Sequence, residues 1–170
     1  MKNVAGDALA GEPFYRELRR RHPDVDIVVL TGREPDPTPI VDTADARRTA
    51  AQTRMTFDEI WHALLDGPAS PSSSWRPGTV DGVVHTELVG RHDVVEAEHR
   101  QVLDRADGQL TARGWSVRAH DHGVPRVLAR HDDITIRLTW WDGSLTLTMQ
   151  GPGTSVGVDA LRELMTEGAA

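Results

Sequence analysis

The sequence has 170 residues, 38% of them hydrophobic and 26% charged, the size and balance of a soluble globular protein with a sizeable core. It has no cysteine and no apolar run long enough for a membrane span or a secretory signal, which predicts a cytoplasmic protein without disulfides. The formal net charge of −7 argues against binding to nucleic-acid phosphates and fits a protein partner with a basic surface.

The first 66 residues carry the pattern of a helix, a strand and a second helix. Residues 13–22 begin with a proline, which the first turn of a helix tolerates, and end before another proline. Residues 25–31 form a short apolar run rich in β-branched side chains, which predicts a strand buried on both faces. Residues 42–66 carry an apolar stripe at helical spacing, and a capping-box pattern at Thr56 indicates that a new helix begins there.

The periodic hydrophobic pattern is interrupted in the middle of the chain. The stretch GPASPSSSWRPG, residues 67–78, combines proline, glycine and serine without periodicity, which predicts a long loop or linker. Beyond it, residues 79–170 predict the element order β-α-β-β-β-β-α, with the first strand over residues 79–90.

Two helices are predicted in this second half. In residues 93–113, Asp93 and Glu96 have the spacing of a capping box, and Gly114 fits the C-terminal cap. The buried stripe of this helix is predicted to comprise Val95, Val102, Leu103, Ala106 and Leu110. The second helix covers residues 158–167, with a stripe of Val158, Leu161, Leu164 and Met165.

Two hairpins of the predicted meander have two-residue turns. Asp142-Gly143 is a favoured turn pair and lies between two alternating runs. It aligns six apolar residues on one face, pairing Trp140 with Leu145, Leu138 with Leu147 and Ile136 with Met149. A turn centred on Asp132-Asp133 extends the same face by pairing Ala129 with Ile136 and Val127 with Leu138.

The loop length and register of the first hairpin are predicted from the requirement that its apolar residues share one face of the sheet. A two-residue loop would turn apolar side chains to the polar face, because a shift of one residue reverses both faces. A three-residue loop over residues 121–123, with Gly123 left-handed, instead pairs Val117 with Val127 and Trp115 with Ala129.

These elements predict an α+β fold. A four- to five-stranded antiparallel meander is covered on its apolar face by the helices at 93–113 and 158–167. An α-β-α segment precedes it and either extends the same sheet or packs beside it. The predicted organisation is therefore residues 1–66, a loop or linker at 67–78, and a lobe at 79–170, which also allows one integrated domain.

Three histidines near the first hairpin raise the question of a metal site. The predicted register places His120 and His122 at one end of the sheet and His131 at the other. The strand between them runs for roughly 23 Å at about 3.3 Å per residue, so these side chains cannot share one ion.

Two Glu-x-x-His pairs, Glu59 with His62 and Glu96 with His99, have the spacing found in di-iron helical bundles. The other long helices of such a bundle are missing, and both glutamates fit capping boxes. The sequence also lacks a glycine-rich phosphate loop and a G-x-S-x-G motif. We therefore expect no catalytic residue, no metal and no cofactor.

The polar face of the meander is rich in arginine. The predicted register places Arg118 opposite Arg126 and Arg137 opposite Leu128, and like charges on adjacent strands are destabilising unless something offsets them. Arginine and tryptophan are common at the centres of protein interfaces. The predicted partner-binding residues are Arg118, Arg126, Arg130, Arg137, Trp141 and His120. The alternative is that the first half of the chain covers this face, or that the arginines only make it soluble.

The leading hypothesis is a non-enzymatic interaction module, such as an adaptor, an inhibitor or an immunity-type binder. It would use either its acidic surface or the arginine-bearing sheet face, with the oligomeric state left open. The alternative is a small-molecule or metal-dependent enzyme with a His/carboxylate site between the two halves, lined by His62, His85 or His99.

Overall fold

The computed structural model describes residue 17 and residues 20–22, 39–65 and 67–167. The chain divides into two units, residues 1–37 and 38–170. In the first unit Glu17, Arg20 and Arg21 are helical, and the Glu17 carboxylate accepts hydrogen bonds from both arginines. The rest of the predicted helix at 13–22 and the predicted strand at 25–31 lie outside the described residues.

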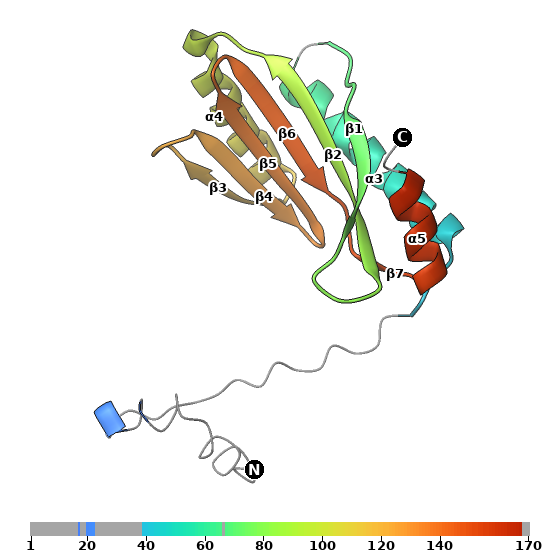
Figure 1. The fold of residues 1–170 in the computed structure, drawn as a ribbon. Coiled ribbons are helices and arrows are strands. Elements are labelled where there is room, and N and C mark those ends of the chain that lie inside the picture. Colours follow the sequence, from blue (N-terminus) through green and yellow to red (C-terminus); the bar gives the residue numbers. More distant parts are fainter. Residues whose placement is uncertain (1–16, 18–19, 23–38, 66, 168–170) are drawn as a thin grey trace. The chain divides into compact units, whose positions relative to one another are not determined.

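The second unit contains an antiparallel sheet and helices (Figure 1). Its elements are α3 (Thr43–Leu64), β1 (Ser72–Pro77), β2 (Val83–Asp93), α4 (Glu96–Ala112), β3 (Ser116–His120), β4 (Arg126–His131), β5 (Ile134–Trp141), β6 (Ser144–Gln150), β7 (Thr154–Ser155) and α5 (Val158–Glu167). The strands follow the order β1-β2-β6-β5-β4-β3, and β7 pairs with the start of β2. The α+β class is confirmed, but the predicted count of four to five strands is wrong, because the described residues form a sheet of seven strands.

One of the additional strands, β1, lies inside the segment predicted to be a loop or linker. Its sequence, SSSWRP, has no alternating pattern, yet it pairs along its whole length with β2, from Ser72 opposite Val89 to Pro77 opposite Val84. A proline is tolerated at the end of an edge strand because no ladder partner needs its missing N–H. Trp75 anchors the strand, since its half-buried side chain packs against a buried cluster.

Helix α3 is continuous. It is capped by Asp42, whose carboxylate accepts a hydrogen bond from the Asp45 N–H at 2.8 Å. The predicted helix start at Thr56 is wrong, because the Thr56 hydroxyl donates to the Gln52 carbonyl one turn earlier and the backbone stays helical. No glycine or proline interrupts this stretch, so the apolar stripe continues through it.

Helix α4 begins later than predicted. Asp93 remains in β2, where it pairs with Ser144, and the Val94 N–H donates to the Gly143 carbonyl at 2.9 Å. The predicted capping box at Asp93 is therefore wrong, and Val95 occupies the N-cap with its side chain exposed instead of buried. The predicted end is confirmed, since Gly114 has a φ of 83°.

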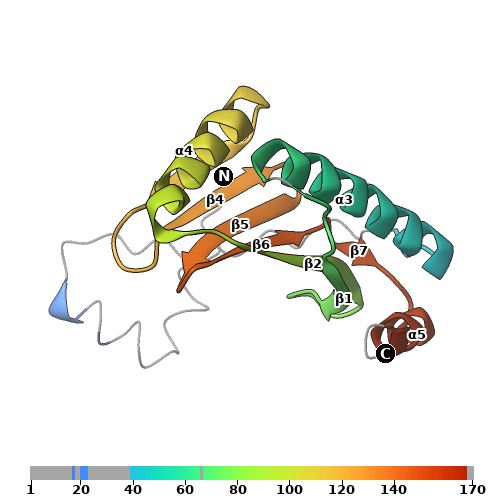
Figure 2. The same ribbon diagram turned by 90° about the horizontal axis from the view of Figure 1, so that it is seen from above.

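Helices α3 and α4 cover one face of the sheet, which we call the inner face (Figure 2). The predicted hairpins build this face as expected, with Trp140 opposite Leu145 and Leu138 opposite Leu147. The main core of Phe57, Trp61, Leu103, Leu110 and further buried residues lies between the helices and the strands. The second half of the predicted N-terminal segment therefore packs on the sheet.

Helix α5 does not join α4 on this core, which corrects the prediction. It contacts β1, and Leu164 belongs to a second cluster with Ala46, Val84 and Val156. Arg47 of α3 bonds the carboxylates of Glu163, at 2.6 Å, and Glu167, which joins the two helices. The cause is β7, which redirects the chain toward β1 after the last long strand.

Candidate functional site

The face of the sheet opposite α3 and α4, here called the outer face, carries polar and charged side chains in register. One row runs across four strands and contains Arg118, Leu128, Arg137 and Thr148. The next row contains Ser116, Arg130, Thr135, Gln150 and Glu87. A third row contains His120, Arg126, Thr139, Thr146 and Arg91.

The register of β3 against β4 differs from the prediction by two residues. Val117 pairs with Ala129 and Arg118 with Leu128, so the predicted pairs with Val127 and Arg126 are wrong. The loop is longer than three residues, because β3 continues to His120 and β4 begins only after Pro125, which has no N–H for the ladder. A shift of two residues keeps each side chain on its predicted face, and Gly123 is left-handed as expected, with a φ of 75°.

Most of the arginines on the outer face lack an acidic partner. Arg91, Arg118, Arg126, Arg130 and Arg137 are all exposed. Within the described part of the chain, only Arg130 of these five has a carboxylate oxygen within 4.0 Å, that of Asp133. Among the outer-facing residues of the strands, the acidic ones are Glu87, which accepts a hydrogen bond from Arg76 at 2.9 Å, and Asp93, which pairs with Ser144. A chain with a net charge of −7 therefore presents a locally basic face.

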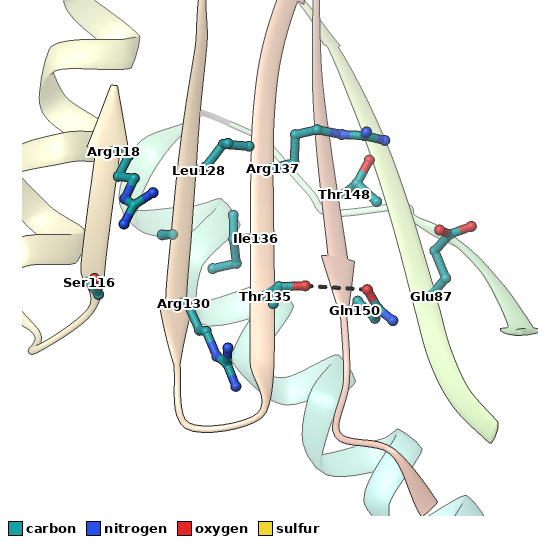
Figure 3. A pocket seen from close by; sticks show the side chains of 11 residues that line it. Glu87, Ser116, Arg118, Leu128, Arg130, Thr135, Ile136, Arg137, Thr148 and Gln150 are labelled. Atoms are coloured by element: carbon teal, nitrogen blue, oxygen red, sulfur yellow. Dashed lines mark hydrogen bonds between the residues drawn. The ribbon is translucent and has the colours of Figure 1, made fainter. Parts of the chain in front are cut away.

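A hollow of about 570 Å³ opens on this face (Figure 3). Arg118, Arg130 and Arg137 line it from three different strands, and Leu128 contributes an apolar surface between them. Glu87 of β2 also lines the hollow, on the side remote from Arg118, and its carboxylate is bonded to Arg76. Guanidinium groups offer planar sets of donors that match carboxylates or phosphates, so the chemistry of the hollow suits an anionic group.

His85 and Gln150 form a hydrogen-bonded pair at the β2 side of the outer face. The Gln150 amide Nε2 lies 2.7 Å from His85 Nε2, and the Thr135 hydroxyl donates to Gln150 Oε1 at 3.4 Å. In this arrangement the amide donates and the imidazole nitrogen accepts, which requires a neutral ring. Burial lowers the pKa of His85 from its usual 6.5, Glu87 opposes this shift, and Arg76 adds to it.

Acidification is expected to destabilise the protein through His85. Its pKa is lower in the folded chain than in the unfolded chain, so the unfolded state binds the proton first and stability falls as the pH drops below about 6.5. His85→Gln, which keeps an amide for Gln150 to bond, should lose less stability between pH 7.5 and pH 5 than the wild type. Urea unfolding at both pH values measures this difference, and equal losses would contradict it.

All six residues predicted to bind a partner lie on the outer face. Arg118, Arg126, Arg130 and Arg137 are distributed over three neighbouring strands. His120 pairs with Arg126, and Trp141, which is 67% exposed, lies at the rim opposite Ser144. Sequence reasoning missed the part of the face contributed by β2, namely His85, Glu87 and Arg91. Their alternation was visible in the sequence, but the pairing of β2 with β6 spans more than fifty residues and leaves no local signal.

The histidines of the alternative enzymatic reading do not meet. His85 lies on the outer face, whereas His62 and His99 belong to the helices on the inner face. His62 Nδ1 bonds the Asp58 carbonyl at 2.6 Å, and the His99 ring stacks on Trp140 at 4.1 Å. Over residues 39–65 and 67–167, together with the few described earlier positions, no group of three or more His, Asp or Glu side chains could hold a metal ion.

No protein-family model, curated protein or solved structure matches the chain. None of the described helices is both long enough and apolar enough to cross a membrane.

Proposed function

We propose that this protein is a cytoplasmic, non-enzymatic interaction module, an adaptor or inhibitor in character, that binds an acidic surface of another protein through its outer face. The observation that carries the proposal is the group of exposed outer-face arginines without acidic partners. Arg118, Arg126 and Arg137 surround the apolar side chain of Leu128, and none of the three has a carboxylate within 4.0 Å among the described residues.

The composition of the face supports binding to a protein. Interface centres are enriched in arginine and tryptophan, because both bury a large area and make directional contacts. Leu128 and the exposed Trp141 provide apolar contact area, and the neighbouring guanidinium groups provide charge. Carboxylates of a partner would offset the positive charge that these arginines concentrate on one face, and such complementary charges favour the complex.

The charge distribution favours an acidic protein surface over a basic one. The net charge of −7 suggested a basic partner, but that charge belongs to the whole chain and the local charge of the outer face is positive. A compact acidic patch can contact the arginines alone, whereas a long nucleic acid would also approach the acidic remainder of the protein.

The test replaces Arg126, Arg137 and Trp141 together, as R126E/R137E/W141A. Wild-type protein captures partners from an extract of its source cells, the captured protein is identified, and its affinity is measured with purified components. We expect the triple variant to lose about a hundredfold in affinity or more, because it reverses two charges and removes an aromatic contact.

The matched control is R100E/R113E/V95A, which makes the same change in net charge at exposed positions on and beside α4. It should bind the partner as the wild type does, and circular dichroism should show both variants folded. Unchanged affinity in the R126E/R137E/W141A variant would overturn the proposal. Equal losses in both variants, or tight binding of an oligonucleotide in place of a protein, would also overturn it.

A further inference from the structure

Strand β3 lies at one edge of the sheet. It pairs with β4 on one side, and no described strand pairs with its other side. The opposite edge, β1, differs in its sequence, because prolines stand just before it and at its end, and a helix contacts each of the two edge strands, α5 at β1 and α4 at β3. Prolines protect an edge from pairing with another chain because they remove backbone donors. Strand β3 has no proline, so each of its residues keeps its backbone N–H. Among the described residues only β4 pairs with β3, which leaves its other edge open to a further strand.

The side chains of β3 indicate which strand it would accept. Arg118 and His120 point to the outer face, where Leu128 and Arg126 are their neighbours on β4. Val117 and Ala119 point to the inner face, and Val117 packs at the border of the main core. An added strand would therefore meet basic groups on one face and small apolar groups on the other.

A second copy of this chain is a poor occupant of the edge. Two β3 strands related by a twofold axis would pair in antiparallel fashion, with the outer-facing residues of one copy opposite outer-facing residues of the other. Arg118 of one copy would lie beside Arg118 of the other, and like charges on adjacent strands repel. The charge of the edge instead fits a strand whose outer-facing residues are acidic.

We propose that β3 binds an extended acidic segment of the partner as an additional strand of the sheet. The main chain of the segment would bond the free edge of β3, and alternate carboxylates would contact Arg118 and the arginines of β4. The residues between them would be small and apolar and would rest beside Val117 and Ala119. This proposal rests on the proposed function and specifies how the partner is recognised.

The experiment uses the full-length protein and the peptide acetyl-EVEAEVE-amide, which alternates acidic and apolar residues. Two further peptides carry N-methyl groups, one on every glutamate nitrogen and one on every valine and alanine nitrogen. In an extended peptide these two sets of N–H groups lie on opposite edges. Strand addition uses one edge, so one methylated peptide should lose at least about tenfold in affinity and the other should bind as the parent does.

Two further measurements accompany the titrations. Arg118→Glu should weaken binding of the parent peptide by about tenfold or more, whereas Arg100→Glu, the same charge change on α4, should leave it unchanged. Hydrogen exchange of the β3 amides that are not bonded to β4 should slow when the peptide is bound.

Several outcomes would overturn strand addition. If both methylated peptides bind like the parent and the β3 amides stay unprotected, the peptide is held by charge alone. Binding that is insensitive to Arg118, or no binding at about 1 mM peptide, would also count against it. The proposed function can fail separately, because its test measures the affinity for the purified partner and changes residues that lie outside β3. Loss of partner binding in R126E/R137E/W141A together with a negative peptide result would contradict only the strand.

Discussion

Gly90→Ala is expected to destabilise the protein by about 3 kcal/mol, although alanine usually improves a strand relative to glycine. Gly90 lies on the inner face of β2, directly under α3. A Cβ atom at this position would lie 2.5 Å from Cζ3 of Trp61 and 2.8 Å from Cζ of Phe57. Both rings are buried and stack on each other at 5.7 Å, so neither can move aside without disturbing the core.

Gly108→Ala is the matched control for this prediction. Gly108 lies in the exposed part of α4, and a Cβ there would meet no atom within 4 Å. Because glycine is a poor helix former, the substitution should stabilise the protein by up to about 1 kcal/mol. Urea unfolding of the two variants should therefore show shifts of opposite sign. A neutral Gly90→Ala would mean that α3 does not approach β2 this closely.

The close approach at Gly90 explains how the candidate site is positioned. With α3 held against β2 and β6, the helices fill the inner face and the arginines of the same strands are left on the outer face. Arg91, the next residue after Gly90, points to the outer face and pairs with Thr146. The core and the candidate site are thus alternate residues of the same strands, which follows from the two-residue period of a strand.

The hairpins show what the sequence alone could predict. The turn at Asp142-Gly143 could be predicted because such a turn needs two adjacent left-handed residues, and Asp-Gly is a favoured pair there. Both residues have positive φ, 48° and 77°. Its register then fixed the face of each residue in β5 and β6. The loop between β3 and β4 had no such constraint on its length. Two registers that differ by two residues bury the same side chains, so patterning could not choose between them.

The positions of β1, β2 and α5 could not be read from the sequence for another reason. Strand β2 pairs with β6, and the intervening chain forms α4 and three other strands. Such long-range pairing is decided by the packing of the complete sheet and not by any local motif. The stripe of α5 was recognised, but Val158 is 70% exposed and only Leu164 is fully buried. A stripe shows which face of a helix is apolar and leaves open what covers it.

Leu138→Ala and Leu128→Ala are expected to differ strongly, although the two leucines lie on adjacent strands. Leu138 is fully buried on the inner face, so its truncation should cost about 2–5 kcal/mol through lost burial and the cavity left behind. Leu128 lies on the outer face within the hollow and is only partly buried. Its truncation should cost less than about 1 kcal/mol, as expected for a residue outside the core.

The comparison also tests whether the outer face is free to bind. If the arginine-lined hollow is open in solution, urea unfolding should show the large loss for Leu138→Ala alone, and Leu128→Ala should weaken partner binding while the fold stays intact. If Leu128→Ala destabilises the protein as much as Leu138→Ala, Leu128 is already packed against something in the free protein. An outer face that is already covered could not serve as the binding surface, and the proposed function would fail before any partner was identified.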